Sequence, residues 1–429
     1  MQAEAVPGTV RTLSPLARQL ALLHAYAFVT YPFACVPFLF LFFRQHGMSA
    51  GDYGEILGAY YLAMFVAEVP TGVLADRFGR ERMLVAGPLL LASGFLTLLL
   101  WPTYGGFLTG ELLLGLGHAV LSGPPGAILY ETLQQHGQQH RFLAIESRLS
   151  ALRLLGTGSA FLLGGALVHV DAASAGYEAA IVATIVGTGL AAVLALGLPH
   201  RPRPPQLRAR AFAGAVAGEL RQPAVAWLLA YWIVLFALLR FPFHDYQPYL
   251  SAAGELEPLL HDPLFTGVLF AALNLGAAPL SALVPQLVAR LGRRTLFWGM
   301  PLLLCASLAV MAGERLAAEA GSGSAALAWL GVTMFFVQQV PFGMHWALLQ
   351  EFVNHRIGSA VRTTVLSALS LVARAVYAGL NVLLFHLQDA RGLGTTFAIV
   401  AGAGALASCA VLWLRPAGLL RGSGPLPRA

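Results

Sequence analysis

The sequence has few charged residues and few cysteines, and it contains no lysine. Charged residues make up only 11% of the 429 positions, whereas hydrophobic residues make up 57%. A soluble globular domain carries roughly 25% charged residues, so this composition excludes an ordinary soluble protein. The mean hydropathy of +0.70 indicates a chain that crosses a membrane several times.

The three cysteines, Cys35, Cys305 and Cys409, all fall inside apolar stretches. This placement argues against a disulfide framework and against a metal cluster, and we expect all three to pack in the core. The sequence also lacks the HExxH, GxSxG and Walker patterns that would indicate a membrane enzyme. It therefore predicts neither an enzyme nor a bound cofactor or metal.

Long apolar windows recur along the chain between short polar or Gly/Pro-rich breaks. An apolar helix needs about 20 residues to cross the roughly 30 Å hydrocarbon layer. The pattern predicts an all-α polytopic membrane protein with twelve spans. We place them at 17–43, 52–74, 83–101, 106–134, 141–169, 175–198, 223–250, 263–289, 294–313, 325–352, 358–387 and 393–415.

All 26 basic residues are arginines, and their distribution predicts the orientation. If both termini are cytoplasmic, most of the arginines between the spans lie on the cytoplasmic side of the membrane. Only Arg44, Arg315 and Arg391 fall in outer loops. The formal charge of +6 then reflects membrane topology and gives no reason to expect a nucleic-acid partner.

The middle of the chain changes abruptly in composition, from His200 to Pro223, into a Pro- and Arg-rich stretch, "HRPRPPQLRARAFAGAVAGELRQP". Such a stretch cannot stay in lipid and reads as a cytoplasmic linker. It predicts a first six-helix bundle at 1–198, a linker at 199–222 and a second six-helix bundle at 223–429.

The two halves contain similar segments in the same order. "YPFACVPFL" from Tyr31 resembles "FPFHDYQPYL" from Phe241, and "RFGRER" from Arg77 resembles "RLGRRT" from Arg290. "LSAL" begins at Leu149 and again at Leu366. An internal duplication is the simplest account, and repeats of this kind are typical of secondary transporters that hold substrate between the halves near the midplane.

The segment "GVLADRFGRERM", from Gly72 to Met83, lies between the second and third predicted spans and resembles the loop signature of the major facilitator superfamily. Gly72 would allow close helix packing, Gly79 would supply a turn, and arginines would hold the loop at the cytoplasmic face. The conformational latch that the signature implies comprises Gly72, Asp76, Arg77, Gly79 and Arg80.

The resemblance implies two pseudo-symmetric six-helix bundles that expose a central site alternately to either side of a bacterial cytoplasmic (inner) membrane, in a monomer. In the superfamily the acid at Asp76 is thought to meet the N-terminal end of the eleventh helix, whose dipole favours an anion. The second copy has Ala289 at the corresponding position.

Two positions depart from the drug-antiporter branch of the superfamily. Glu111 stands four residues before Gly115, where that branch usually carries an arginine, and Phe161 replaces an expected proline in "GTGSAFLLGG". Antiport is therefore less firmly indicated than transport. The small residues of this segment would also allow tight contact with a neighbouring helix.

Arg240 and Arg374 lie within predicted spans, where an arginine costs about 2.5 to 3.5 kcal/mol on insertion scales. Each has a structural reading, as half of an ion pair, and Asp245 could serve Arg240. Each also has a functional reading, as a group that binds an anionic or zwitterionic solute, because guanidinium matches carboxylate and phosphate.

Three titratable residues are candidates for proton coupling: Glu68, His244 and Asp245. A histidine changes its charge near neutral pH, and a carboxyl group inside the membrane can take up a proton. The alternatives are a solvated outer-gate pair for His244 and Asp245, and an ion pair with a gate arginine for Glu68.

Charges near the cytoplasmic ends of adjacent spans are typical of a gate. We expect a gating network that opens and closes as the halves rock. Its members would be Glu131, Arg148, Arg153, Glu351 and Arg362.

Uncharged polar side chains at mid-span complete a predicted substrate site, although a lone polar residue there often makes a helix-to-helix hydrogen bond instead. With the two arginines, the candidate substrate-binding residues are Tyr31, His118, Arg240, Asn274, Gln338, Gln339, His345, Arg374 and Tyr377.

The sequence thus predicts a secondary active transporter of a small amphiphilic solute, anionic or zwitterionic, proton-coupled and working in export. The expected partners are the solute, protons and the lipid bilayer. The alternative is a transporter-like receptor or scaffold without flux.

Overall fold

The computed structural model describes residues 14–199, 222–356, 359–416 and 419–420. These residues are almost entirely helical, and no strand occurs among them. The first helices along the chain are α1 (Pro15–Val29), η1 (Val36–Phe38), α2 (Leu39–Gln45), α3 (Ala50–Phe78), α4 (Arg80–Leu100), α5 (Tyr104–Leu121), α6 (Pro124–Gln135), α7 (Phe142–Val170) and α8 (Ala175–Leu196). The later ones are α10 (Pro223–Ala253), α11 (Pro263–Glu319), α12 (Ala325–Arg356), α13 (Ser359–Arg391) and α14 (Leu393–Trp413).

Within the described residues, 10 helical stretches are long and apolar enough to cross a membrane. Two shorter apolar helices, Val36–Gln45 and Pro263–Ala277, lie in the remaining predicted spans. The predicted all-α polytopic fold class is therefore confirmed. The structure differs from the prediction in where helices are interrupted.

The first predicted span is broken between Thr30 and Cys35, on either side of Pro32. Neighbouring helices satisfy the backbone groups that the break exposes: Thr157 of α7 donates to the carbonyl of Tyr31 at 3.0 Å, and Cys35 N–H donates to Thr184 of α8 at 3.2 Å. Irregular backbone is tolerated at membrane depth where neighbouring helices provide such hydrogen bonds.

The prolines of the seventh predicted span do not interrupt its helix. Helix α10 runs for 31 residues through Pro242 and Pro248. Each proline removes one backbone hydrogen bond, and the rest of the ladder continues past it.

Two glycines mark corresponding turns in the similar segments of the two halves. Gly79 separates α3 from α4 with φ 96°, and Gly292 kinks α11 with φ 77°. A positive φ is costly for residues with a Cβ atom, so glycine is needed at both turns. The matched segments "RFGRER" and "RLGRRT" therefore share a backbone conformation as well as residue types.

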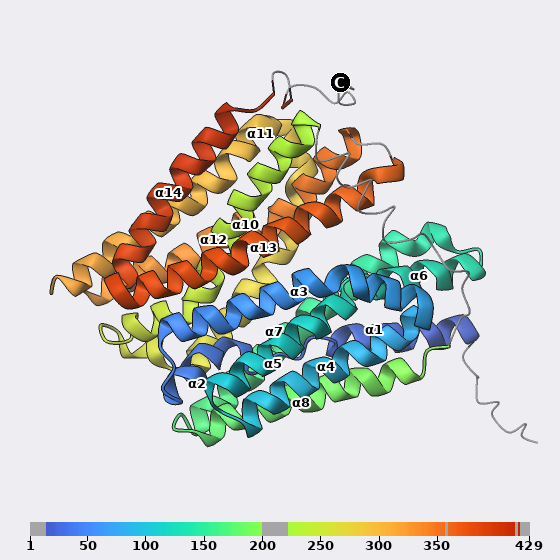
Figure 1. The fold of residues 1–429 in the computed structure, drawn as a ribbon, viewed down its shortest axis with the longest axis horizontal. Helices are drawn as coiled ribbons and strands as arrows, with labels where there is room; N and C mark the ends of the chain where they lie inside the picture. Colours follow the sequence, from blue (N-terminus) through green and yellow to red (C-terminus); the bar gives the residue numbers. More distant parts are fainter. Residues whose placement is uncertain (1–13, 200–221, 357–358, 417–418, 421–429) are drawn as a thin grey trace, which may run out of the picture.

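Helices α1 to α8 lie together in the lower part of Figure 1, and α10 to α14 lie together above them. We refer to these as the first and second groups. Two pairs of long helices cross between the groups, α3 with α13 and α7 with α11. The predicted domain limits at 198 and 223 remain a prediction, because residues 200–221 lie outside the described part.

The glycines of α7 permit close contacts in two directions. A Cβ atom on Gly156 would lie 1.8 Å from the carbonyl oxygen of Phe28, and one on Gly164 would lie 1.9 Å from that of Ala34. Both contacts are within the first group. Gly165 instead faces the second group, where a Cβ atom would lie 2.9 Å from the Cα of Gly267 on α11.

The two groups are joined by hydrogen bonds at the predicted outer end of the molecule, at the left of Figure 1. The carboxylate of Asp389 on α13 accepts from the N–H groups of Ala50 (3.1 Å) and Gly51 (2.6 Å) in the first turn of α3. The side chain of Gln247 on α10 donates to the carbonyl of Val36 and accepts from the N–H of Phe40. We call these contacts the outer closure.

Asp389→Asn should open the outer closure, because asparagine lacks the charge that favours the N-terminus of a helix. We expect the population with separated outer ends to rise by about tenfold, the equivalent of one charge-assisted hydrogen bond. Spin labels on the exposed residues Gln45 and Arg391, one in each group, would measure the distance.

Asp52→Asn is the matched control for this change, because Asp52 accepts from the N–H of Ser49 within its own helix at 2.8 Å. It should leave the label distances unaltered. Equal distance distributions in Asp389→Asn and the unaltered protein would contradict a role for Asp389 in holding the groups together.

Candidate functional site

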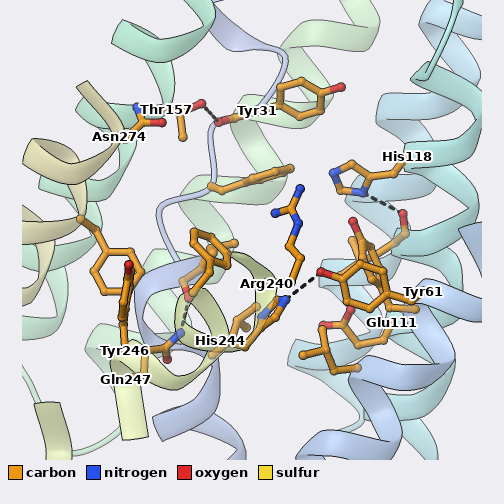
Figure 2. Close-up of a pocket in the computed structure, with 18 of the residues that line it drawn as sticks. Tyr31, Tyr61, Glu111, His118, Thr157, Arg240, His244, Tyr246, Gln247 and Asn274 are labelled. Carbon is orange, nitrogen blue, oxygen red and sulfur yellow. Dashed lines mark hydrogen bonds between the residues drawn. The ribbon is translucent and has the colours of Figure 1, made fainter. Parts of the chain in front are cut away.

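A cavity of about 460 Å³ lies between the two groups. This volume is within the range of about 300 to 1,000 Å³ that is usual for small-molecule sites. The break in the first span, α3, α5 and α7 line it from the first group, and α10, α11, α12 and α13 line it from the second. Figure 2 shows Tyr61 and His118 on one side, Tyr246 and Asn274 on the other, and Arg240 and His244 between them.

Most of the predicted site residues line this cavity. They are Tyr31, His118, Arg240, His244, Asn274, Gln339 and Arg374. The remaining predicted substrate and proton-coupling residues do not contribute to the lining. They are Glu68, Asp245, Gln338, His345 and Tyr377.

His118 belongs to a cluster of rings on the first-group wall. It stacks on Tyr31 with ring centroids 5.7 Å apart, and Phe33 and Tyr60 contact it at 5.6 and 5.5 Å. Its Nδ1 is 3.0 Å from the carbonyl oxygen of Leu114 one helical turn earlier. The break in the first span therefore places Tyr31 and Phe33 against α5, where they form an aromatic cluster with His118.

His244 links the two groups across the cavity. Its Nε2 is 2.8 Å from the hydroxyl of Tyr61 on α3. Tyr377 supports both rings from behind, with centroids 5.0 Å from Tyr61 and 6.2 Å from His244. Tyr377 is buried, so its role here is to fix the orientation of residues that line the cavity.

The other predicted residues behind the wall are held by neighbours. Gln338 accepts from the hydroxyl of Tyr246 at 2.9 Å and donates to Ser307 at 3.0 Å. His345 stacks on Trp232 with centroids 5.5 Å apart. These contacts are structural, because both side chains connect helices of the second group.

The two intramembrane arginines differ in their surroundings. Arg374 forms an ion pair with Glu68 at 3.2 Å, which joins α13 to α3. Arg240 lies over the ring of Phe236 at 5.4 Å, and it has no anionic partner among the residues that the structure describes. The expected pairing of Arg240 with Asp245 is therefore not found.

Asp245 does not contribute to the lining of the cavity and is fully buried. Gln388 of α13 donates to its Oδ1 at 2.7 Å, and its Oδ2 has no hydrogen-bond partner in the described structure. The Tyr377 hydroxyl, the Asn381 Oδ1 and the Gln388 Oε1, all on α13, also lack described partners. Buried polar atoms are rarely left without partners, so this group of four around α13 is unusual.

Sequence reasoning missed Glu111 as a site residue. Glu111 of α5 lines the cavity, is only 7% exposed, and has no hydrogen bond or ion pair among the described residues. The signal was available, because an acid at mid-span is costly and this one stands where the drug-antiporter branch usually carries an arginine.

The predicted gate charges pair differently from the expectation. Glu131 accepts from Arg80 at 2.9 Å, which links α6 to α4, whereas Arg153 donates to Glu146 of its own helix at 2.6 Å. Arg148 is exposed on α7. The predicted network of Glu131 with Arg148 and Arg153 is therefore absent from the described structure.

The loop signature is described only in part. Arg77 lies over the ring of Phe78 at 5.4 Å. A Cβ atom on Gly72 would meet nothing within 4 Å, so the expected close packing at Gly72 is not found. The side chains of Asp76, Glu351 and Arg362 lie outside the described part.

Of the three cysteines, Cys35 and Cys305 are buried and Cys409 is exposed on α14. The expectation of core packing is wrong for Cys409. In the described part of the chain, no group of three or more His, Cys, Asp or Glu side chains could hold a metal ion.

The model of the Major Facilitator Superfamily matches residues 22–380. Multidrug resistance protein MdtH of Aeromonas salmonicida is 32% identical over 140 residues, which cover 32% of this chain and 34% of that protein. An MFS-type transporter of Aspergillus fumigatus is 32% identical over 99 residues, or 22% of this chain and 23% of the relative. The chain thus spans about a third or less of the length of these relatives.

Two solved structures share the fold. A mutant of the nucleoside transporter NupG matches with a TM-score of 0.79 at 13% identity, over 92% of this chain and 99% of that chain. A mutant of the peptide transporter POT matches with a TM-score of 0.71 at 16% identity, over 95% of each chain. At such low identity these likenesses concern the fold alone.

Proposed function

Because the chain belongs to the Major Facilitator Superfamily, and is thus a membrane transporter and not an enzyme, we propose that it exports a small amphiphilic solute in exchange for protons. The cavity between the two groups is the observation that carries this proposal. Its aromatic rings suit the apolar part of a solute, and Arg240 offers a charge for a polar part.

The outer closure indicates which side of the membrane the cavity would serve in this conformation. Asp389 and Gln247 join the groups at the predicted outer end, so the cavity in this conformation would take up solute from the cytoplasm. A relative that carries the name Multidrug resistance protein is compatible with export. Orientation with both termini in the cytoplasm of a bacterial inner membrane is part of the same proposal.

Asp245 is the proposed proton carrier among the three predicted candidates. Glu68 is engaged by Arg374, and His244 by the Tyr61 hydroxyl. Asp245 has one amide donor and no cationic partner among the described residues. Enclosing a carboxylate without a cation costs several kcal/mol, and taking up a proton removes that cost.

Proteoliposomes that contain a pH-sensitive dye would test this function. Adding aromatic amines, acids and zwitterions under an imposed pH gradient should reveal at least one solute whose movement dissipates the gradient. Arg240→Ala, which removes a charge from the cavity, should lower that rate by about tenfold, as expected for one charge-assisted contact.

Protein-free liposomes supply the baseline for the dye signal. Solute binding without any movement across the membrane would contradict transport and favour the receptor or scaffold alternative. A solute flux that ignores the pH gradient would contradict only the proton coupling.

A further inference from the structure

Two side chains of opposite charge line the cavity without compensation. Glu111 of α5 and Arg240 of α10 both contribute to its wall. Neither forms a hydrogen bond or an ion pair with any residue that the structure describes. They come from different groups, so a solute in contact with both would bridge the two halves of the molecule.

Three other arginines of the described helices are compensated by acids. Arg374 pairs with Glu68, Arg80 pairs with Glu131, and Arg315 pairs with Glu314. A charge removed from water without a partner costs several kcal/mol, so the unpaired Glu111 and Arg240 need an explanation. Their shared feature is that both face the cavity, where a solute can compensate them.

The position of each residue along its helix gives its distance from the outer end of that helix. Glu111 is seven residues from Tyr104 at the outer end of α5, and Arg240 is thirteen from Ala253 at the outer end of α10. At 1.5 Å per residue, Glu111 lies roughly 10 Å and Arg240 roughly 20 Å from the outer end of its own helix. Tyr60 and Tyr61 of α3 are close enough to interact electrostatically with both.

We propose that the cavity selects a zwitterion whose basic amine binds Glu111 and whose acidic group binds Arg240, with an aromatic or apolar body between them. A carboxylate accepts hydrogen bonds from an ammonium group, and guanidinium donates two parallel hydrogen bonds to an acid. The rings of Tyr60 and Tyr61 add attraction for the amine. This inference rests on the proposed function, since it names the class of solute that the same cavity carries.

Three probes that share a benzene ring would test the inference by equilibrium binding. They are para-(aminoethyl)benzoate, phenethylamine and para-ethylbenzoate, which carry both charges, the amine alone and the acid alone. The zwitterion should bind the unaltered protein about tenfold or more tightly than either of the others, as expected for one additional charge-assisted contact.

Single substitutions should separate the two contacts. Glu111→Gln should weaken the binding of the zwitterion and of the amine by about tenfold and leave the binding of the acid unchanged. Arg240→Gln should weaken the binding of the zwitterion and of the acid and leave the binding of the amine unchanged. Glu111→Asp keeps the charge and should retain most of the preference for the amine. Glu178→Gln and Arg391→Gln, at exposed positions, are the matched controls.

The inference is overturned if the zwitterion gains no affinity over the single-charge probes or does not bind at millimolar concentration. If a folded Glu111→Gln variant loses the binding of all three probes alike, the inference is also overturned, because that result indicates a structural role for Glu111. If a variant does not fold, the comparison of probes on the unaltered protein still decides the matter. No pH gradient is present in these measurements, so their outcome is separate from that of the flux experiment.

Discussion

Asp245→Asn is expected to abolish the accumulation of solute driven by a pH gradient, while exchange of solute down its own gradient continues. Asparagine fits the same space and still accepts from Gln388, whose donor atom lies 2.7 Å from Oδ1 in the native protein, but it cannot carry a proton. One pH unit supplies about 1.4 kcal/mol per proton, which corresponds to tenfold accumulation. Under a gradient of about two pH units, the ratio of solute concentrations across the membrane should therefore fall from about 100 to about one in this variant.

Reconstituted vesicles loaded with the most active solute from the flux screen would provide this measurement. Asp245→Glu restores a carboxyl group and should recover part of the accumulation, whereas Glu178→Gln, at an exposed position on α8, should have no effect. Undiminished accumulation in Asp245→Asn would show that the proton is carried elsewhere. Glu68 and His244 would then be the residues to replace next.

The buried surroundings of Asp245 explain why it suits this role better than the two alternatives. Tyr53 of α3 and Tyr377 of α13 are close enough to interact with its charge, and both are buried. Asp245 thus sits where α10 and α13 meet the first group. Adding or removing a proton there changes the free energy of a contact that must alter when the groups move.

The apolar windows predicted the spans because helix length and hydrophobicity are local properties of the chain. Ten of the predicted spans are long apolar helices in the structure, and the loop signature placed the turn at Gly79. Interruptions inside spans were harder to predict. Pro32 lies in a break whereas Pro242 does not, because tertiary neighbours decide whether exposed backbone groups find partners.

Partner choice among charged residues could not be predicted from the sequence. Arg315 was expected in an outer loop, but it is buried, pairs with Glu314 and lies over the ring of Tyr249. Glu131 meets Arg80 instead of Arg148. Both outcomes depend on the rotation of each helix about its axis, which side-chain packing sets and hydropathy does not reveal.

In the candidate site, too, the sequence predicted some features and not others. Seven of the residues predicted from the sequence line the cavity. Tyr377 and His345 have the right depth but face other helices. The cost of an acid within a span already marked Glu111 in the sequence, but its place in the cavity wall is visible only when the neighbours are placed.

The neighbouring glycines 164 and 165 of α7 should give opposite results when each is changed to valine. A Cβ atom on Gly164 would lie 1.9 Å from the carbonyl oxygen of Ala34, which belongs to the same group. The helices of one group cannot separate without losing their core, so Gly164→Val should cost about 3 kcal/mol or more and prevent stable folding. Thermal unfolding in detergent would measure the loss.

Gly165→Val should leave folding intact and shift the conformation. Its Cβ atom would lie 2.9 Å from the Cα of Gly267, and this contact joins the two groups. The groups can relieve the clash by moving apart at the outer end, which weakens the outer closure while each keeps its own packing. We therefore expect a stable protein that spends most of its time open to the outside and transports at a small fraction of the normal rate.

A cysteine at His118, in a background with Cys409→Ser, would report the opening, because His118 lines the cavity and Cys409 is exposed. A membrane-impermeant maleimide added from outside should label it slowly in the parent and rapidly with Gly165→Val. Unfolding of both valine variants alike would show that the α7–α11 contact belongs to a single rigid core. Unchanged labelling and transport in a folded Gly165→Val variant would show that this contact does not control access to the cavity.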